Sequence, residues 1–210
     1  MNPSLQRLIV TGSIMLATIM KALDSTIANV ALPHMQGTFS ATQEQISWVL
    51  TSYIVAAAVF TPTTGFLASR FGRRNLLAAA VIGFTIASML CGAATTIEEI
   101  VLFRLLQGMF GAALVPLSQA ILLDTYPPEQ HGSAMAVWGM GVMVGPILGP
   151  ALGGWLTDAY NWRWVFYINV PFGLLALAGI FAASSESEGD RSRRFDWMGF
   201  AWLGIAIASL

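Results

Sequence analysis

Residues 14–33, IMLATIMKALDSTIANVALP, form an apolar run that carries Lys21 and Asp24 well inside it. A membrane-spanning helix needs about 20 such residues, so the run is long enough to cross a bilayer. A charged side chain near the centre of a spanning helix costs about 2.5–3.5 kcal/mol on insertion scales. Ionisable residues at that depth are therefore rare and by default indicate function. The run predicts a helix in the wall of an ion-coupled transport pathway.

The composition excludes several other classes of protein. Of the 210 residues, 56% are hydrophobic and 10% are charged, whereas about 25% are charged in a typical soluble domain. The formal net charge of −1 provides no basic field for nucleic acid. Cys91 is the only cysteine, so an intrachain disulfide is impossible. The sequence contains no nucleophile–base pairing, metal-ligand spacing or phosphate loop, so we predict neither an enzyme nor a metal or cofactor site.

Hydropathy predicts an all-α membrane protein with six complete spans and the start of a seventh. Pro33 is expected to end the first span, and a polar loop is expected to follow it. A hydrophilic linker is predicted at residues 184–196, and the final apolar run, 197–210, is too short to span. We therefore expect the N-terminal part of a longer protein. The six spans, which form a predicted domain at residues 1–183, are residues 8–32, 46–68, 76–94, 100–123, 133–156 and 165–183.

Basic residues set the expected orientation, because cytoplasmic loops are rich in Lys and Arg. Under strict alternation of the spans, Arg7, the turn after the second span and the arginines of the linker share one side, which we place in the cytoplasm. The segment 65–69, GFLAS, is echoed by 154–158, GWLTD, at the opposite membrane face. Two three-helix repeats of inverted topology would give this echo, and a chance match is the alternative.

Three charges are expected at a similar depth. At about 1.5 Å per residue, Asp24 lies roughly 24 Å from a cytoplasmic start near Leu8, in the outer half of a core about 30 Å thick. Lys21 lies at a similar level, and Arg104 enters from outside to a depth of roughly 6–10 Å. We predict that Asp24 takes up and releases protons, with Arg104 and Lys21 adjusting its proton affinity. A static ion pair that fixes helix packing is the alternative.

Glycine recurs every fourth residue of the fifth predicted span, at positions 141, 145, 149 and 153. Such a face lets another backbone approach closely. Pro146 and Pro150 repeat at the same spacing, and each removes a backbone donor and loosens the helix. The pattern predicts a moving helix interface, and an ordinary packing seam is the alternative. The residues of this motif are Gly141, Gly145, Pro146, Gly149, Pro150, Gly153 and Gly154.

Two further groups are candidates for function. The basic turn after the second span either latches a gate or serves only as a topology signal, and the spacing does not separate these readings. Its residues are Gly65, Arg70, Gly72, Arg73 and Arg74. Asn29, Gln107 and Gln119 either contact a substrate cavity or form plain interhelical hydrogen bonds.

Taken together, these stretches resemble the major facilitator superfamily, and within it the drug:proton antiporters with fourteen spanning helices, the EmrB/QacA type. Five segments carry the resemblance in order along the chain. They are Leu23 to Pro33, Gly65 to Arg74, Arg104 with Gln107 and Gly108, Gly145 to Gly154, and Asn161 to Pro171. Ser69 stands where the loop motif usually has an acidic residue, so a charge relay through that carboxylate is not carried over.

The resemblance implies the N-terminal six-helix half of this transporter fold in the cell inner membrane. It also implies export of lipophilic or cationic drugs in exchange for protons by alternating access, with a proton gradient as the energy source. In Gram-negative relatives it implies a periplasmic adaptor and an outer-membrane channel as partners. An importer or metabolite exporter on the same scaffold is one alternative. A non-transporting membrane partner or sensor is another, and a buried Asp24–Arg104 pair without a water path would favour it.

Overall fold

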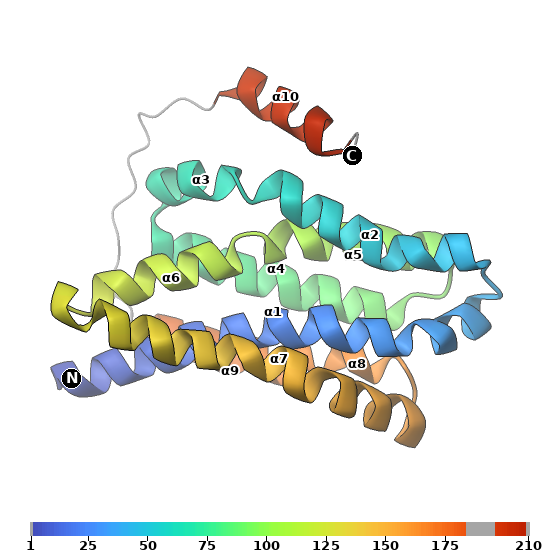
Figure 1. Cartoon of the computed structure of the whole chain (residues 1–210), viewed down its shortest axis with the longest axis horizontal. Helices are drawn as coiled ribbons and strands as arrows, with labels where there is room; N and C mark the ends of the chain where they lie inside the picture. The colour runs from blue at the N-terminus through green and yellow to red at the C-terminus, as the bar shows by residue number, and fades with distance from the viewer. Residues whose placement is uncertain (1, 184–195, 209–210) are drawn as a thin grey trace.

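The longest helix, α1 (Pro3–Phe39), runs the length of the molecule and contacts α6, α7 and α9 along its course (Figure 1). The computed structural model describes residues 2–183 and 196–208, and no strand occurs among them. The other helices are α2 (Gln43–Phe60), α3 (Thr63–Phe71), α4 (Arg73–Ala93), α5 (Ile97–Gly111), α6 (Leu114–Thr125), η1 (Pro128–Gln130), α7 (His131–Ala159), α8 (Trp164–Tyr167), α9 (Asn169–Ala183) and α10 (Trp197–Ala208).

Five of the described helical segments are long and apolar enough to cross a membrane, and a sixth is added if α2 and α3 count as one bent span. Most of them run nearly side by side in Figure 1. A second group of contacts joins α5 to α2 and α4. Two apolar cores fill the bundle, one around Phe84 and Leu114 and the other around Ile27 and Phe166. Asp24 of α1 and Arg104 of α5 lie between helices of these two groups.

Three predicted spans are not single helices. The second is divided into α2 and α3, which meet at 59° next to Pro62. The fourth is divided into α5 and α6, and the sixth into α8 and α9. Pro116 and Pro171 stand in the first turns of α6 and α9, where a helix has no use for the missing amide donor. Hydropathy cannot detect these breaks, because the flanking residues remain apolar.

The prediction that Pro33 ends the first span is wrong, because α1 continues through this proline to Phe39. The extension makes tertiary contacts that offset the lost backbone bond. Met35 is fully buried, Phe39 packs edge-on against Trp162 with ring centroids 5.4 Å apart, and the Trp162 Nε1 donates to Thr38 Oγ1 at 2.9 Å. Tertiary packing therefore overrides the local helix-breaking signal.

The glycine face of α7 packs against α1. A Cβ added to Gly145 would lie 2.5 Å from the Ala22 carbonyl carbon, and one added to Gly149 would lie 2.0 Å from Thr26 Oγ1. Thr26 Oγ1 also lies 3.0 Å from the Gly145 carbonyl oxygen. Gly141 and Gly153 share the buried face. Pro146 and Pro150 are exposed, and α7 continues through both. Gly154 lies outside this contact, with nothing near its Cβ position.

Of the predicted linker and the expected start of a seventh span, the structure describes residues 196–208. Residues 184–195, which include Arg191, Arg193 and Arg194, lie outside the described residues. α10 lies against α2, where Phe200 and Phe60 approach with ring centroids 5.8 Å apart.

We predict that Gly145→Ala destabilises the protein by about 1–3 kcal/mol, because the new methyl group would overlap backbone atoms of α1 that cannot move aside cheaply. Thermal unfolding of the purified full-length protein in detergent measures the effect. Gly139→Ala is the matched control on the same helix, since its Cβ position is open. Equal melting temperatures for the two variants would contradict the close α1–α7 packing.

Candidate functional site

Asp24 of α1 and Arg104 of α5 form a buried ion pair. The Arg104 Nη1 lies 2.7 Å from Asp24 Oδ2, and the two side chains are 0% and 1% exposed, in that order. The sequence predicted that these charges share one depth, and the structure brings them into direct contact. A pair this deeply buried loses the hydration of both ions, so its stability depends on further hydrogen bonds to both partners.

Three donors surround the carboxylate of Asp24. In addition to Arg104, the Gln107 Nε2 donates to Asp24 Oδ1 at 2.8 Å, and the Asn169 Nδ2 donates to the same oxygen at 2.9 Å. All four side chains are buried. Because every contact to the carboxylate is a donor, the arrangement fits the ionised form of Asp24.

The guanidinium of Arg104 is held on several sides. Its Nε donates to the Val49 carbonyl oxygen at 3.1 Å, and its Nη1 donates to Gln107 Oε1 at 2.8 Å. The Tyr53 ring lies beneath it, with its centroid 4.1 Å from Cζ. Gly108 allows α5 this close to α2, since a Cβ there would lie 2.4 Å from the Tyr53 carbonyl oxygen. A planar group with separate donors suits such a site better than an ammonium does.

A second layer of polar side chains supports the carboxylate. The Asn169 Nδ2 also donates to Ser88 Oγ at 2.9 Å, and Ser88 Oγ donates to the Phe166 carbonyl oxygen at 2.8 Å. The Cys91 Sγ contacts Gln107 Oε1 at 3.6 Å. Sequence reasoning missed Asn169, Ser88 and Tyr53 as site residues. The available signal was an amide inside an apolar segment, where polar side chains are costly and tend to be functional.

Several buried polar atoms around the ion pair have no hydrogen-bond partner among the described residues. They are the Tyr53 hydroxyl, the Arg104 Nη2 and the Asn169 Oδ1. A buried polar group left unpaired costs about 1–3 kcal/mol. Native proteins rarely contain such groups, and each one requires an explanation. Three of them around one carboxylate mark this network as the candidate site of a change in partner or protonation.

Other predicted site residues lie apart from this network. Lys21 is half-buried and makes no ion pair or hydrogen bond within the described part of the chain. Asn29 is exposed and donates to the Ser25 carbonyl oxygen of its own helix at 2.9 Å. Gln119 is half-buried. Gln107 forms an interhelical hydrogen bond with Asp24, as one of its two predicted roles requires, and it does not line either cavity described for this structure.

The basic turn connects α3 to α4 and contacts α6 and α9. Gly72 has a φ of 83°, which favours glycine, and connects α3 to α4. Arg73 pairs with Asp124 at the end of α6, and the Arg74 Nη2 donates to the Phe181 carbonyl oxygen at 3.2 Å. Arg70 lies near two aromatic rings of its own segment. Gly65 lies in α3 with open space at its Cβ position.

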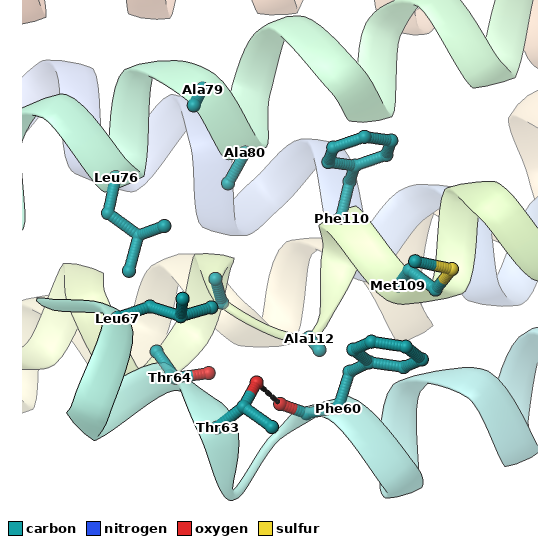
Figure 2. A pocket seen from close by; sticks show the side chains of 11 residues that line it. Phe60, Thr63, Thr64, Leu67, Leu76, Ala79, Ala80, Met109, Phe110 and Ala112 are labelled. Atoms are coloured by element: carbon teal, nitrogen blue, oxygen red, sulfur yellow. Dashed lines mark hydrogen bonds between the residues drawn. The ribbon is translucent and has the colours of Figure 1, made fainter. Parts of the chain in front are cut away.

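An apolar cavity of about 200 Å³ lies where α3 turns away from α2, facing α4 and the α5–α6 break (Figure 2). Its polar side chains are Thr63 and Thr64, and Thr63 Oγ1 donates to the Phe60 carbonyl oxygen at 2.7 Å. A second cavity of about 330 Å³ adjoins Ser69 and Arg73. Neither cavity contains a residue of the Asp24 network, so the charge chemistry is separate from both.

Comparison with known proteins gives consistent results. The profile of the Major Facilitator Superfamily matches residues 14–209. The chain is similar to the multidrug export protein EmrB of Escherichia coli (strain K12), with 44% identity over 98% of this chain and 40% of the relative. It is also similar to the fatty acid resistance protein FarB of Neisseria gonorrhoeae, with 49% identity over 96% of this chain and 40% of the relative. The chain thus spans about two fifths of these relatives.

Among solved structures, the chain is similar to the partially occluded, inward-open xylose transporter XylE from E. coli. The TM-score is 0.76 and the sequence identity is 17%, and the match covers 97% of this chain and 58% of that one. At this identity the likeness shows the fold alone.

We predict that Arg104→Lys lowers the free energy of unfolding by about 2 kcal/mol or more, although the charge is retained. The ammonium cannot reproduce both the bond to the Val49 carbonyl and the stacking on Tyr53. Chemical or thermal denaturation of the full-length protein measures the loss. Arg7→Lys, at an exposed position, is the control, and a loss no greater than in that control would contradict the role given to the planar guanidinium.

Proposed function

Because the chain belongs to the Major Facilitator Superfamily, we propose that the full protein is a proton-coupled efflux transporter for lipophilic or cationic drugs. The fold is the predicted all-α N-terminal half of this family's transporter fold, and the family and fold are those of transporters rather than enzymes. The observation that carries the proposal is the buried Asp24–Arg104 pair. The similarity to a multidrug export protein supports the substrate class.

The geometry suggests how a proton would drive a conformational change. While Asp24 is ionised, its three donors tie α1 to α5 and α9. Protonation removes the counterion of Arg104 and leaves a buried, uncompensated cation, and breaking a buried pair in this way costs about 3–5 kcal/mol. The protonated protein is therefore biased toward a second state in which Arg104 is hydrated or finds another partner. A ligand that binds the two states unequally is then coupled to the proton.

The close contact between α1 and α7 is the surface along which we expect α1 to move. Glycines keep one side of α7 free of side chains where it meets α1, so a shift of α1 would displace only its own side chains, such as Met15 and Thr26, and would break the hydrogen bond from Thr26 Oγ1 to the Gly145 carbonyl. We propose that this seam moves during alternating access, as the spacing of Gly141, Gly145, Gly149 and Gly153 predicts. The proposed energy source is the proton gradient, without a cofactor.

A buried Asp24–Arg104 pair without a water path would favour the sensor alternative, and the burial of the pair meets the first of these two conditions. An occluded state of a transporter has the same feature, and family membership favours transport. We propose that the protein lies in the cell inner membrane, as the resemblance implies, and that its N-terminus is cytoplasmic, which the arginine distribution supports. A periplasmic adaptor and an outer-membrane channel stay a prediction from the resemblance.

We predict that Asp24→Asn abolishes drug flux driven by a pH gradient, because the amide cannot take up and release a proton. The measurement uses the full-length protein in proteoliposomes, with tetraphenylphosphonium as the lipophilic cation and direct assays of its binding and its movement. Binding should persist while proton-driven flux falls to background. His34→Gln, which removes an exposed ionisable group from the same helix, should leave the flux unchanged. Undiminished coupling in Asp24→Asn would refute the proposed role.

The second proposal concerns Arg73 and Asp124, which join the α3–α4 turn to the end of α6. We predict that Asp124→Asn lowers flux severalfold if the pair latches a gate, while stability changes by no more than about 1 kcal/mol, as expected for an exposed pair. Asp158→Asn is the control, since this acid is exposed at the end of α7. If the arginines are only a topology signal, Asp124→Asn will transport like wild type.

A further inference from the structure

The amide of Asn169 contacts Asp24 through only one of its two ends. Its Nδ2 donates to Asp24 Oδ1 and Ser88 Oγ, both at 2.9 Å, whereas its Oδ1 is buried and without a hydrogen-bond partner in the described part of the chain. The opposite orientation would set this carbonyl oxygen against the carboxylate, and two acceptors would then face each other. The present orientation therefore belongs to ionised Asp24.

A protonated Asp24 needs an acceptor for its new O–H. Of the oxygens around the carboxylate, Gln107 Oε1 is already engaged by Arg104 and Cys91. The Asn169 Oδ1 is the unengaged acceptor on a side chain that already touches Asp24 Oδ1. Rotation of the amide by half a turn would bring this oxygen to the position that Nδ2 now occupies. A side-chain amide offers a donor and an acceptor of nearly the same shape on one rotor.

We propose that Asn169 is a positioning residue that reports the protonation state of Asp24 by rotating its side-chain amide. In the ionised state the Nδ2 donates to Asp24. When a proton delivered from the aqueous phase adds to Asp24 Oδ1, the amide turns and Asn169 Oδ1 accepts the new O–H. The inference deepens the proposed function and rests on it, because it requires Asp24 to titrate.

The rotation is coupled to the backbone at the break between α8 and α9. Asn169 is the first residue of α9, and Ser88, its second partner, donates to the Phe166 carbonyl oxygen in α8. When the amide turns, Ser88 faces an acceptor instead of a donor. Its hydroxyl then donates to Asn169 and releases the Phe166 carbonyl. Proton uptake at α1 would thus change a bond across the α8–α9 break.

Other charged or titratable groups face Asp24 from the surrounding helices. They are Arg104 of α5, Tyr53 of α2 and Cys91 of α4, and Lys21 lies one turn away on α1 itself. None of these groups is an acceptor that touches Asp24 in the described structure. Because each of these groups could also affect the titration of Asp24, the pH dependence of transport cannot identify the contribution of Asn169. A direct probe of the new hydrogen bond is required.

The test is the acid-minus-alkaline infrared difference spectrum of the full-length protein in lipid. The carboxylic C=O band that disappears in Asp24→Asn identifies protonated Asp24. In Asn169→Ala this band should move to a higher wavenumber, because its O–H has lost its acceptor. Asn29→Ala, which removes an amide of α1 whose hydrogen bond in the described structure is to its own helix, should leave the band in place.

A second measurement does not require the variant to fold. In wild-type protein with ¹³C-labelled asparagine, the labelled amide carbonyl band should shift on acidification, together with the appearance of the Asp24 band. An Asp24 band that stays in place in Asn169→Ala, or an asparagine band insensitive to acid, would overturn this inference and leave the proposed function intact. If no band depends on Asp24, both the inference and the proposed function fail.

Discussion

Burial of one carboxylate against one guanidinium is the constraint on which the rest of the structure depends. Asp24 and Arg104 are almost completely removed from solvent, and two ions in such a place are stable only if hydrogen bonds replace their lost hydration. The helices that supply these bonds must therefore stand at fixed positions around α1. α2 contributes the Val49 carbonyl and α9 contributes Asn169. The packing of these helices around the centre of α1 thus follows from the charge that α1 carries.

The same constraint explains why small residues gather around this helix. α5 approaches α2 closely at Gly108, which lets the Arg104 guanidinium meet the Val49 carbonyl and the Tyr53 ring. α7 approaches α1 closely at Gly145 and Gly149, where α7 has no side chain between the two helices. The lipid tails of a bilayer are as apolar as leucine, so helices associate there through close packing and hydrogen bonds rather than through exclusion of water. Glycine therefore positions the charge network, and in the proposed mechanism it also provides the surface along which α1 shifts.

Much of the fold could be predicted from the sequence, and the reasons are physical. Long apolar runs give the membrane spans, and depth arithmetic placed Asp24 and Arg104 at one level. The breaks inside three spans could not be predicted, because Pro62, Pro116 and Pro171 interrupt a helix without changing its hydropathy. Pro33 carried the same local signal, yet α1 continues through it. Whether a proline ends a helix depends on tertiary contacts, which a single sequence does not show.

The candidate site was predictable in its charges and not in its neutral partners. A buried charge is unusual enough in an apolar run to be noticed singly, and Asp24 and Arg104 stand out for that reason. Neutral amides and hydroxyls carry a weaker signal, since many of them satisfy their own helix, as Asn29 does. Asn169 differs from Asn29 only in what the fold places beside it. Its role therefore depends on the meeting of α1, α4 and α9, which are distant in the sequence.

The position of Asn169 at a helix start matters for how a proton could act on the whole bundle. The first backbone amides of a helix have no intrahelical partner, so a change at the first residue of α9 disturbs fewer helical backbone bonds than a change in the middle of a span. A change in hydrogen bonding there meets less resistance from the helix than the same change would meet within α1. In the proposed mechanism the ion pair provides the energy difference between two states, and the neighbouring α8–α9 break provides a place where the backbone can yield.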